Sequence, residues 1–154
     1  MSMKSAPAWI ALAWAFLAGA SATAEVRVLD GDTFETAAER IRLFGIDAPE
    51  RAQRGGAQAA DALRRFIGKA QPSCIEVDRD RYGRVVALCT VGGADLSLSM
   101  VSAGHAVAWC SYLQRQRPEF LPKFRAAEAQ ARQARLGIWR AEFVPWRDWG
   151  CPAR

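Results

Sequence analysis

Hydrophobic and polar residues alternate along much of the stretch from residue 25 to residue 46, and this pattern predicts short β-strands. The alternation covers three segments, residues 25–30, 33–36 and 40–46. In the third segment, Ile41 and Leu43 share one face of the strand, while Arg40 and Arg42 share the other. Because the connections are short and residues 30–31 (Asp-Gly) are a turn signal, we expect the three strands to form a meander.

Apolar residues at helical spacing predict three helices in the rest of the chain. The first is marked by residues three or four positions apart and by a glycine that ends it: Ala57, Ala60, Leu63, Ile67 and Gly68. The other two are expected over residues 98–103, before Gly104, and over residues 119–136, before Gly137.

Two segments rich in β-branched residues, 74–77 and 85–89, flank a turn-rich stretch and predict a β-hairpin. If its turn is centred between Arg81 and Tyr82, Cys74 lies directly opposite Cys89. Opposed residues of a non-hydrogen-bonded pair have Cα atoms about 4.5 Å apart, which suits a disulfide. The chain has four cysteines and no C-x-x-C pair, so a second disulfide is expected by elimination, between Cys110 and Cys151.

Strands and helices in this order favour one α+β domain that is mainly β. We expect a five-stranded Greek-key barrel of the OB type with three helices packed on it. The spacing alone leaves other small α+β folds open.

The first 24 residues are expected to be a signal peptide, so that residues 25–154 form the domain. Lys4 precedes an apolar run over residues 8–18, and residues 22–24 (Ala-Thr-Ala) resemble a cleavage site. An uncleaved N-terminal anchor is the alternative, although the run is shorter than the about 20 residues that span a bilayer. Export to a bacterial periplasm or out of the cell would explain disulfide use.

The chain of 154 residues carries 21 Lys and Arg against 16 Asp and Glu, a formal charge of +5. A positive charge favours an anionic partner but does not identify one. His105 is the only histidine, which argues against a His-rich zinc site, and we expect it to be structural.

Two acidic motifs carry the candidate chemistry, Asp-Gly-Asp-Thr at 30–33 and Asp-Ala-Pro-Glu at 47–50. Carboxylates brought together raise one another's pKa unless a cation compensates them, and oxygen ligands suit Ca²⁺ or Mg²⁺. Arg42 and Arg84 could bind phosphate oxygens beside such a cation. Taken singly, the same residues could be a hairpin turn, a loop and solvated arginines.

Five motifs together resemble the staphylococcal nuclease (thermonuclease) family. They lie in the family's order at residues 30–33, 42–50, 80–84, 104–106 and 137–139. The resemblance implies an OB-type barrel with three helices and a Ca²⁺-dependent phosphodiesterase that acts on DNA and RNA and leaves 3′-phosphates.

The resemblance also implies roles for individual residues. Calcium would be bound by Asp32, Asp47 and the backbone carbonyl of Ala48, with Asp30 and Thr33 close by. The catalytic residues would be Arg42, Glu50 and Arg84. Substrate would be bound by Arg81 and Tyr82 at a terminal phosphate and by Tyr112 at a base, with Trp109 only loosely aligned to a second family tyrosine.

Two other functions stay open from the sequence. An OB-type domain can bind nucleic acid without cleaving it, and a basic exported domain can bind a polyanionic polysaccharide. Such a module need not keep both carboxylates, both arginines and the glutamate, and all five are present here. We therefore expect an enzyme. We also expect it to be a monomer, to prefer single-stranded or denatured nucleic acid and to have no membrane partner after signal cleavage.

Overall fold

The computed structural model describes residues 26–140 and Cys151. The expected signal peptide, residues 1–24, lies outside the described residues. Within the described part, no helix is both long and apolar enough to cross a membrane.

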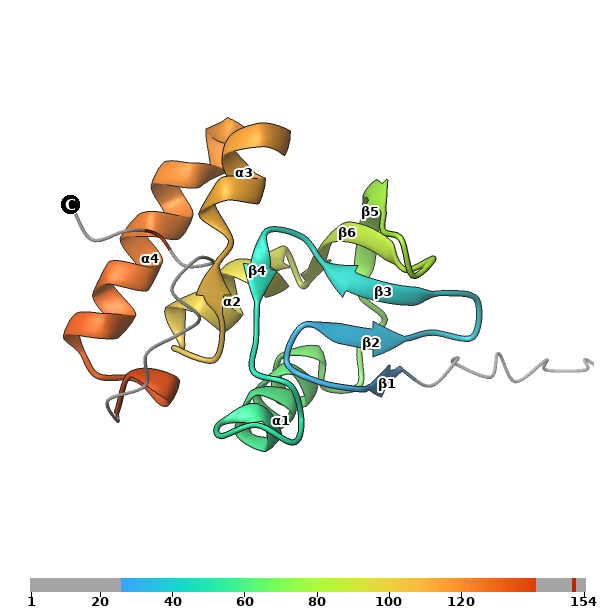
Figure 1. The fold of residues 1–154 in the computed structure, drawn as a ribbon. Helices are drawn as coiled ribbons and strands as arrows, with labels where there is room; N and C mark the ends of the chain where they lie inside the picture. Colours follow the sequence, from blue (N-terminus) through green and yellow to red (C-terminus); the bar gives the residue numbers. More distant parts are fainter. Residues whose placement is uncertain (1–25, 141–150, 152–154) are drawn as a thin grey trace, which may run out of the picture.

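The main sheet begins with the expected meander of β1 (Arg27–Val28), β2 (Thr33–Glu35) and β3 (Arg40–Leu43) (Figure 1). β6 (Val85–Val91) pairs with β3 in parallel, and β5 (Ser73–Arg79) forms the far edge. β7 (Ala94–Asp95) also pairs with β6. The sheet therefore joins the N-terminal meander directly to the hairpin of the middle of the chain.

The strand expected over residues 40–46 is divided between two sheets. β3 ends at Leu43, and β4 (Ile46–Asp47) pairs with β8 (Val107–Ala108) in a separate two-stranded sheet. Gly45, between them, has a φ of 74°, and a Cβ there would lie 2.6 Å from a methyl group of Leu113. The alternating pattern did not reveal this break, because Gly45 turns the chain without interrupting the run of buried residues.

The hairpin of β5 and β6 pairs Cys74 with Cys89, as expected, and the two cysteines form a disulfide. The pairing shifts by one residue between Glu76 and Asp78. Because of this bulge, Arg79 faces Val85, and the turn is centred on Tyr82 rather than between Arg81 and Tyr82.

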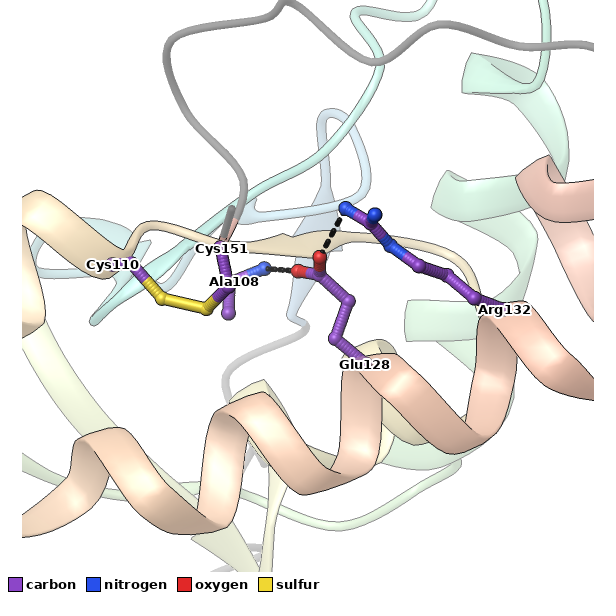
Figure 2. The surroundings of a disulfide bond; sticks show 5 residues. All are labelled: Ala108, Cys110, Glu128, Arg132 and Cys151. Carbon is purple, nitrogen blue, oxygen red and sulfur yellow. Dashed lines mark hydrogen bonds and ion pairs between the residues drawn. A yellow bond between two sulfur atoms is a disulfide. The ribbon is translucent and has the colours of Figure 1, made fainter. Parts of the chain in front are cut away.

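The second disulfide joins Cys110 to Cys151, with their Cα atoms 5.2 Å apart (Figure 2). Both expected pairings are thus confirmed.

Helix α1 (Gly56–Ile67) ends at Gly68, as its pattern predicts. α2 (Leu96–Ser102) begins two residues earlier than expected, because the Asp95 side chain accepts the backbone N–H of Leu98 at 3.0 Å and caps the helix.

The last helix, α4 (Leu121–Gln133), follows a 3₁₀ turn (Pro118–Phe120) and is shorter than expected. Arg135, at a φ of 51°, takes the left-handed position that closes it, and Leu136 N–H donates to the Ala131 carbonyl. Gly137 instead begins a second 3₁₀ turn, η2 (Gly137–Arg140).

Helix α3 (Cys110–Gln116) was not predicted. Only Cys110 and Leu113 are buried along it, so it lacks the apolar periodicity that marks longer helices.

The described residues therefore contain eight short strands and four α-helices, where five strands and three helices were expected. Helical residues outnumber strand residues, so the α+β class is confirmed but the described part is not mainly β. One core joins the layers, and its fully buried members include residues of β2, the β3–β4 turn, α1, α2, α3 and α4: Phe34, Phe44, Leu63, Met100, Leu113 and Phe124.

Candidate active site

A cavity of about 600 Å³ opens beside the junction of β3, β4 and the β5–β6 turn. Most of the site residues expected from the sequence line it: Asp32, Arg42, Asp47, Glu50, Arg81, Tyr82, Arg84 and Tyr112. The other three, Asp30, Thr33 and Ala48, do not line the cavity, but each makes a hydrogen bond with Asp32. The structure thus brings together residues that lie up to 82 positions apart in the chain.

Strand register decides which side chains meet. In the β2–β3 ladder, Thr33 lies opposite Arg42, and Asp32 directly precedes Thr33. Asp47 reaches the same place from β4, after the turn at Gly45. The two acidic motifs therefore converge on one arginine.

Arg42 is 8% exposed and lies between two carboxylates. Its Nη2 donates to Asp47 Oδ1 at 2.9 Å, and its Nη1 forms an ion pair with Asp32. Asp32 is also fixed by Thr33, whose hydroxyl donates to Oδ1 at 2.9 Å, and by the Ala48 N–H, which donates to Oδ2 at 2.8 Å. These contacts hold Asp32 in one orientation.

Burial dominates the electrostatics of this cluster. It raises the pKa of Asp47 and of Asp30, and the nearby Arg42 only partly offsets the effect. Burial also lowers the pKa of Arg42, against the opposing influence of Asp47. One arginine thus leaves the carboxylates incompletely compensated, which is an environment that a further cation would stabilise.

Arg84 is oriented by Asp80, a residue to which the sequence assigned no role in the site. Asp80 Oδ2 accepts Arg84 Nε at 2.6 Å, and Oδ1 accepts the backbone N–H groups of Tyr82 and Arg84. The same carboxylate therefore shapes the β5–β6 turn and aims the guanidinium at the cavity. Its position in the motif at residues 80–84 was the signal that could have identified it.

Two aromatic groups border the cavity. Tyr82 is 69% exposed, with the guanidinium of Arg81 4.8 Å from its ring centroid. Trp109 stacks on Tyr112 with centroids 4.9 Å apart and an interplanar angle of 25°. The structure therefore places Trp109, aligned only loosely from the sequence, at the same wall as Tyr112.

Tyr112 is also bound through its hydroxyl, which donates to Asp78 Oδ2 at 3.2 Å. Burial and the charge of Asp78 raise the pKa of Tyr112 to about 12. The phenol therefore stays neutral at physiological pH and can serve as a flat apolar surface with a fixed orientation.

Glu50 lines the cavity from the loop after β4 and is exposed. Its carboxylate makes no hydrogen bond or ion pair with another described residue, unlike those of Asp32 and Asp47. A carboxylate without a partner in the cavity is available to a water molecule or a substrate.

The donors of the site suit a hard cation. Asp32 and Asp47 offer carboxylate oxygens, and neither thiol nor imidazole is among the described residues that line the cavity. Among residues 26–140 and Cys151, however, no three Asp, Glu, His or Cys side chains are grouped so that they could hold a metal ion by themselves. A Ca²⁺ ion would therefore need backbone and water oxygens in addition, which calcium accepts readily.

The sequence also matches a known protein family. The family described as staphylococcal nuclease homologue matches residues 40–141. The chain belongs to this family. Its domain is an OB-type fold, so the expected OB type is confirmed, whereas the expected counts of strands and helices are not.

Several relatives are named as nucleases. An uncharacterized endonuclease of Escherichia coli is 37% identical over 131 residues, which cover 79% of this chain and 82% of the relative. The micrococcal nuclease of Shigella flexneri is 33% identical over 135 residues, covering 79% and 76%. Together with the family match, these relatives support a nuclease function.

A third relative carries a different name. The succinoglycan biosynthesis protein ExoI of Rhizobium meliloti (strain 1021) is 33% identical over 130 residues, or 77% of this chain. The matched region spans 64% of that relative, so less than two thirds of its length is shared.

Proposed function

We propose that this protein is a Ca²⁺-dependent phosphodiesterase that cleaves DNA and RNA and leaves 3′-phosphates. The observation that carries the proposal is the position of Arg42, buried between Asp32 and Asp47 beside a cavity that also contains Glu50 and Arg84. A binding module needs positive charge, but it does not need two carboxylates paired with a buried arginine next to a glutamate that has no partner among the described residues.

Asp32, Asp47 and the backbone carbonyl of Ala48 are the groups that would hold the cation. When bound, Ca²⁺ would supply positive charge that stabilises the non-bridging phosphate oxygens. The pKa values of Asp30 and Asp47, raised by burial, support a cation requirement at this place.

The remaining polar groups act on the phosphate and on water. Glu50 accepts a proton from the attacking water or orients it. Arg42 and Arg84 bind phosphate oxygens and bind them more strongly as phosphorus becomes five-coordinate, which makes their contribution catalytic. Asp80 keeps Arg84 in position through the 2.6 Å contact.

Substrate is held on both sides of the reacting phosphate. Arg81 and Tyr82 bind a terminal phosphate, and the stacked pair of Tyr112 and Trp109 receives a base. A base can stack there only when it has left its own duplex, so we propose a preference for single-stranded or denatured substrate.

We further propose that the protein is exported and acts as a monomer in the periplasm or outside the cell. Two disulfides that use all four cysteines support an oxidising compartment. The mass of the protein purified from the culture medium or periplasm of its host tests this, because cleavage after residue 24 gives a defined mature chain.

Product analysis tests the chemistry. We expect mass spectrometry of digested single-stranded DNA and RNA to find 3′-phosphate and 5′-hydroxyl ends. Products with 5′-phosphates would contradict the proposed direction of cleavage, and tight binding with no products would indicate a binding module.

A further inference from the structure

A second cavity, of about 410 Å³, lies at the start of α1, beside the end of the loop that precedes this helix. Glu50 lines the candidate active site, whereas Arg54, four residues later, lines this cavity. Its walls come from three segments that lie close together in Figure 1: the start of α1, the turn between α2 and β8, and η2. No role in the proposed function falls to these residues.

The walls are fixed by backbone contacts. Ile138 N–H donates to the Gly104 carbonyl at 2.8 Å, and a Cβ on Gly137 would lie 2.1 Å from that same oxygen. On the other side, a Cβ on Gly55 would lie 3.2 Å from Ile138 Cγ2. The three segments therefore touch one another, and the cavity between them is part of the fold.

The cavity is lined by positive charge. Arg54, His105 and Arg140 line it, and no Asp or Glu is among its described lining residues. Arg54 and Arg140 make no ion pair with any described residue, whereas Arg42 and Arg84 in the candidate active site each have a carboxylate partner. Within the part of the chain that the structure describes, the basic groups of the second cavity are thus uncompensated.

Two further groups there have no partner among the described residues. His105 Nδ1 is buried and has no hydrogen-bond partner within the described structure. Gly55, which directly precedes helix α1, provides no side-chain cap, and the first turn of α1 has no acidic residue, so no described side chain of this segment compensates the positive end of the helix dipole. Burial lowers the pKa of His105, and the charges of Arg65 and Arg140 lower it further.

We propose that this cavity binds a phosphate group, and that in the nuclease it holds a backbone phosphate of the strand that is being cleaved. Guanidinium groups that are not engaged by carboxylates are the natural partners of phosphate oxygens. The assignment to a strand rests on the proposed function and on the loop before α1, which carries Glu50 at the candidate active site and Arg54 at the second cavity.

The chain's single histidine provides a direct probe of the site. We expect titration with inorganic phosphate to shift the NMR signals of the His105 ring saturably and to raise its pKa, because a bound anion stabilises the imidazolium. The double variant Arg54→Gln/Arg140→Gln should lose this response. Lys123→Gln, which removes one exposed charge outside the cavity, should keep it.

Both arginines of the double variant are exposed, so we expect its thermal unfolding to match that of the wild type. A phosphate response that persists in this variant, or that never saturates in the wild type, would overturn the phosphate site.

Salt dependence tests whether a strand occupies the site. Affinity for a single-stranded oligonucleotide, measured with chelator so that hydrolysis plays no part, should fall in the double variant. The plot of log affinity against log salt concentration has a negative slope. Its magnitude should be smaller by about 0.7 for each phosphate that the variant no longer neutralises. If the double variant has the same slope as Lys123→Gln while inorganic phosphate still shifts the NMR signals of His105 in the wild type, the site binds free phosphate and the strand assignment is wrong.

Neither measurement uses cleavage. A protein that binds phosphate at His105 but never hydrolyses DNA would refute the proposed function and leave the phosphate site standing. Full hydrolysis with no phosphate response would refute the phosphate site and leave the proposed function standing.

Discussion

The carboxylate of Glu128 on α4 accepts the backbone N–H of Ala108 in β8 at 2.7 Å (Figure 2). Glu128 is 2% exposed, and its second oxygen forms an ion pair with Arg132 one helical turn later. Ala108 pairs with Ile46 in β4, and the next residue of β4 is Asp47. One buried carboxylate thus connects α4 to β8, and β8 pairs with the strand that carries a candidate calcium ligand.

We expect Glu128→Ala to destabilise the fold by about 1–3 kcal/mol, because the Ala108 N–H would be left buried without an acceptor. Glu128→Gln should lose less stability, since its amide oxygen can still accept that hydrogen bond. Denaturant unfolding of the two variants measures the difference. Equal stability of Glu128→Ala and the wild type would show that the contact contributes nothing to stability.

The two disulfides should differ in their contribution to stability. Their sequence separations are 15 and 41 residues, for Cys74–Cys89 and Cys110–Cys151. In the chain-entropy model, loops of these lengths correspond to about 3 and about 4 kcal/mol. Each disulfide can be removed by a double Cys→Ala variant. The free energy of unfolding should therefore decrease more when Cys110 and Cys151 are replaced than when Cys74 and Cys89 are. The opposite order would exclude loop entropy as the main contribution.

Stability should depend on the protonation of His105. Burial, with Arg65 and Arg140, lowers its pKa in the folded state below the ordinary 6.5, so the unfolded state takes up the proton first. The free energy of unfolding should therefore decrease as the pH falls through 6.5 and level off below the folded-state pKa. His105→Gln should lack this component when unfolding is measured at matched pH values. A variant with the same pH profile as the wild type would contradict the shift.

The catalytic assignment predicts a separation of binding from turnover. Glu50→Gln and Arg84→Ala should lower kcat by about 100-fold or more while leaving affinity for single-stranded DNA nearly unchanged. Lys123→Gln is the matched surface control and should keep full turnover. Near-normal kcat in either site variant would remove that residue from the mechanism.

Local patterns predicted much of this structure. The opposition of Cys74 and Cys89 follows from hairpin register, and the end of α1 follows from Gly68, because both depend on residues close together in sequence. Helix α3 escaped prediction because it buries only two side chains on its own.

Long-range pairings could not be derived in the same way. The β4–β8 ladder joins residues about 60 positions apart, and nothing in either two-residue strand indicates its partner. The convergence of Asp32 and Asp47 on Arg42 depends on that ladder and on the turn at Gly45. The motifs named the residues of the site, and the tertiary fold decides which of them meet.

The most direct test of the proposed function is a Ca²⁺ titration of hydrolysis on single-stranded DNA, with Glu50→Gln measured in parallel. We expect wild-type cleavage to appear with Ca²⁺, to disappear with chelator and to return when Ca²⁺ is restored, while Glu50→Gln binds DNA and leaves it intact. Cleavage that persists in chelator, or DNA binding by the wild type without cleavage at any Ca²⁺ concentration, would contradict a calcium-dependent nuclease.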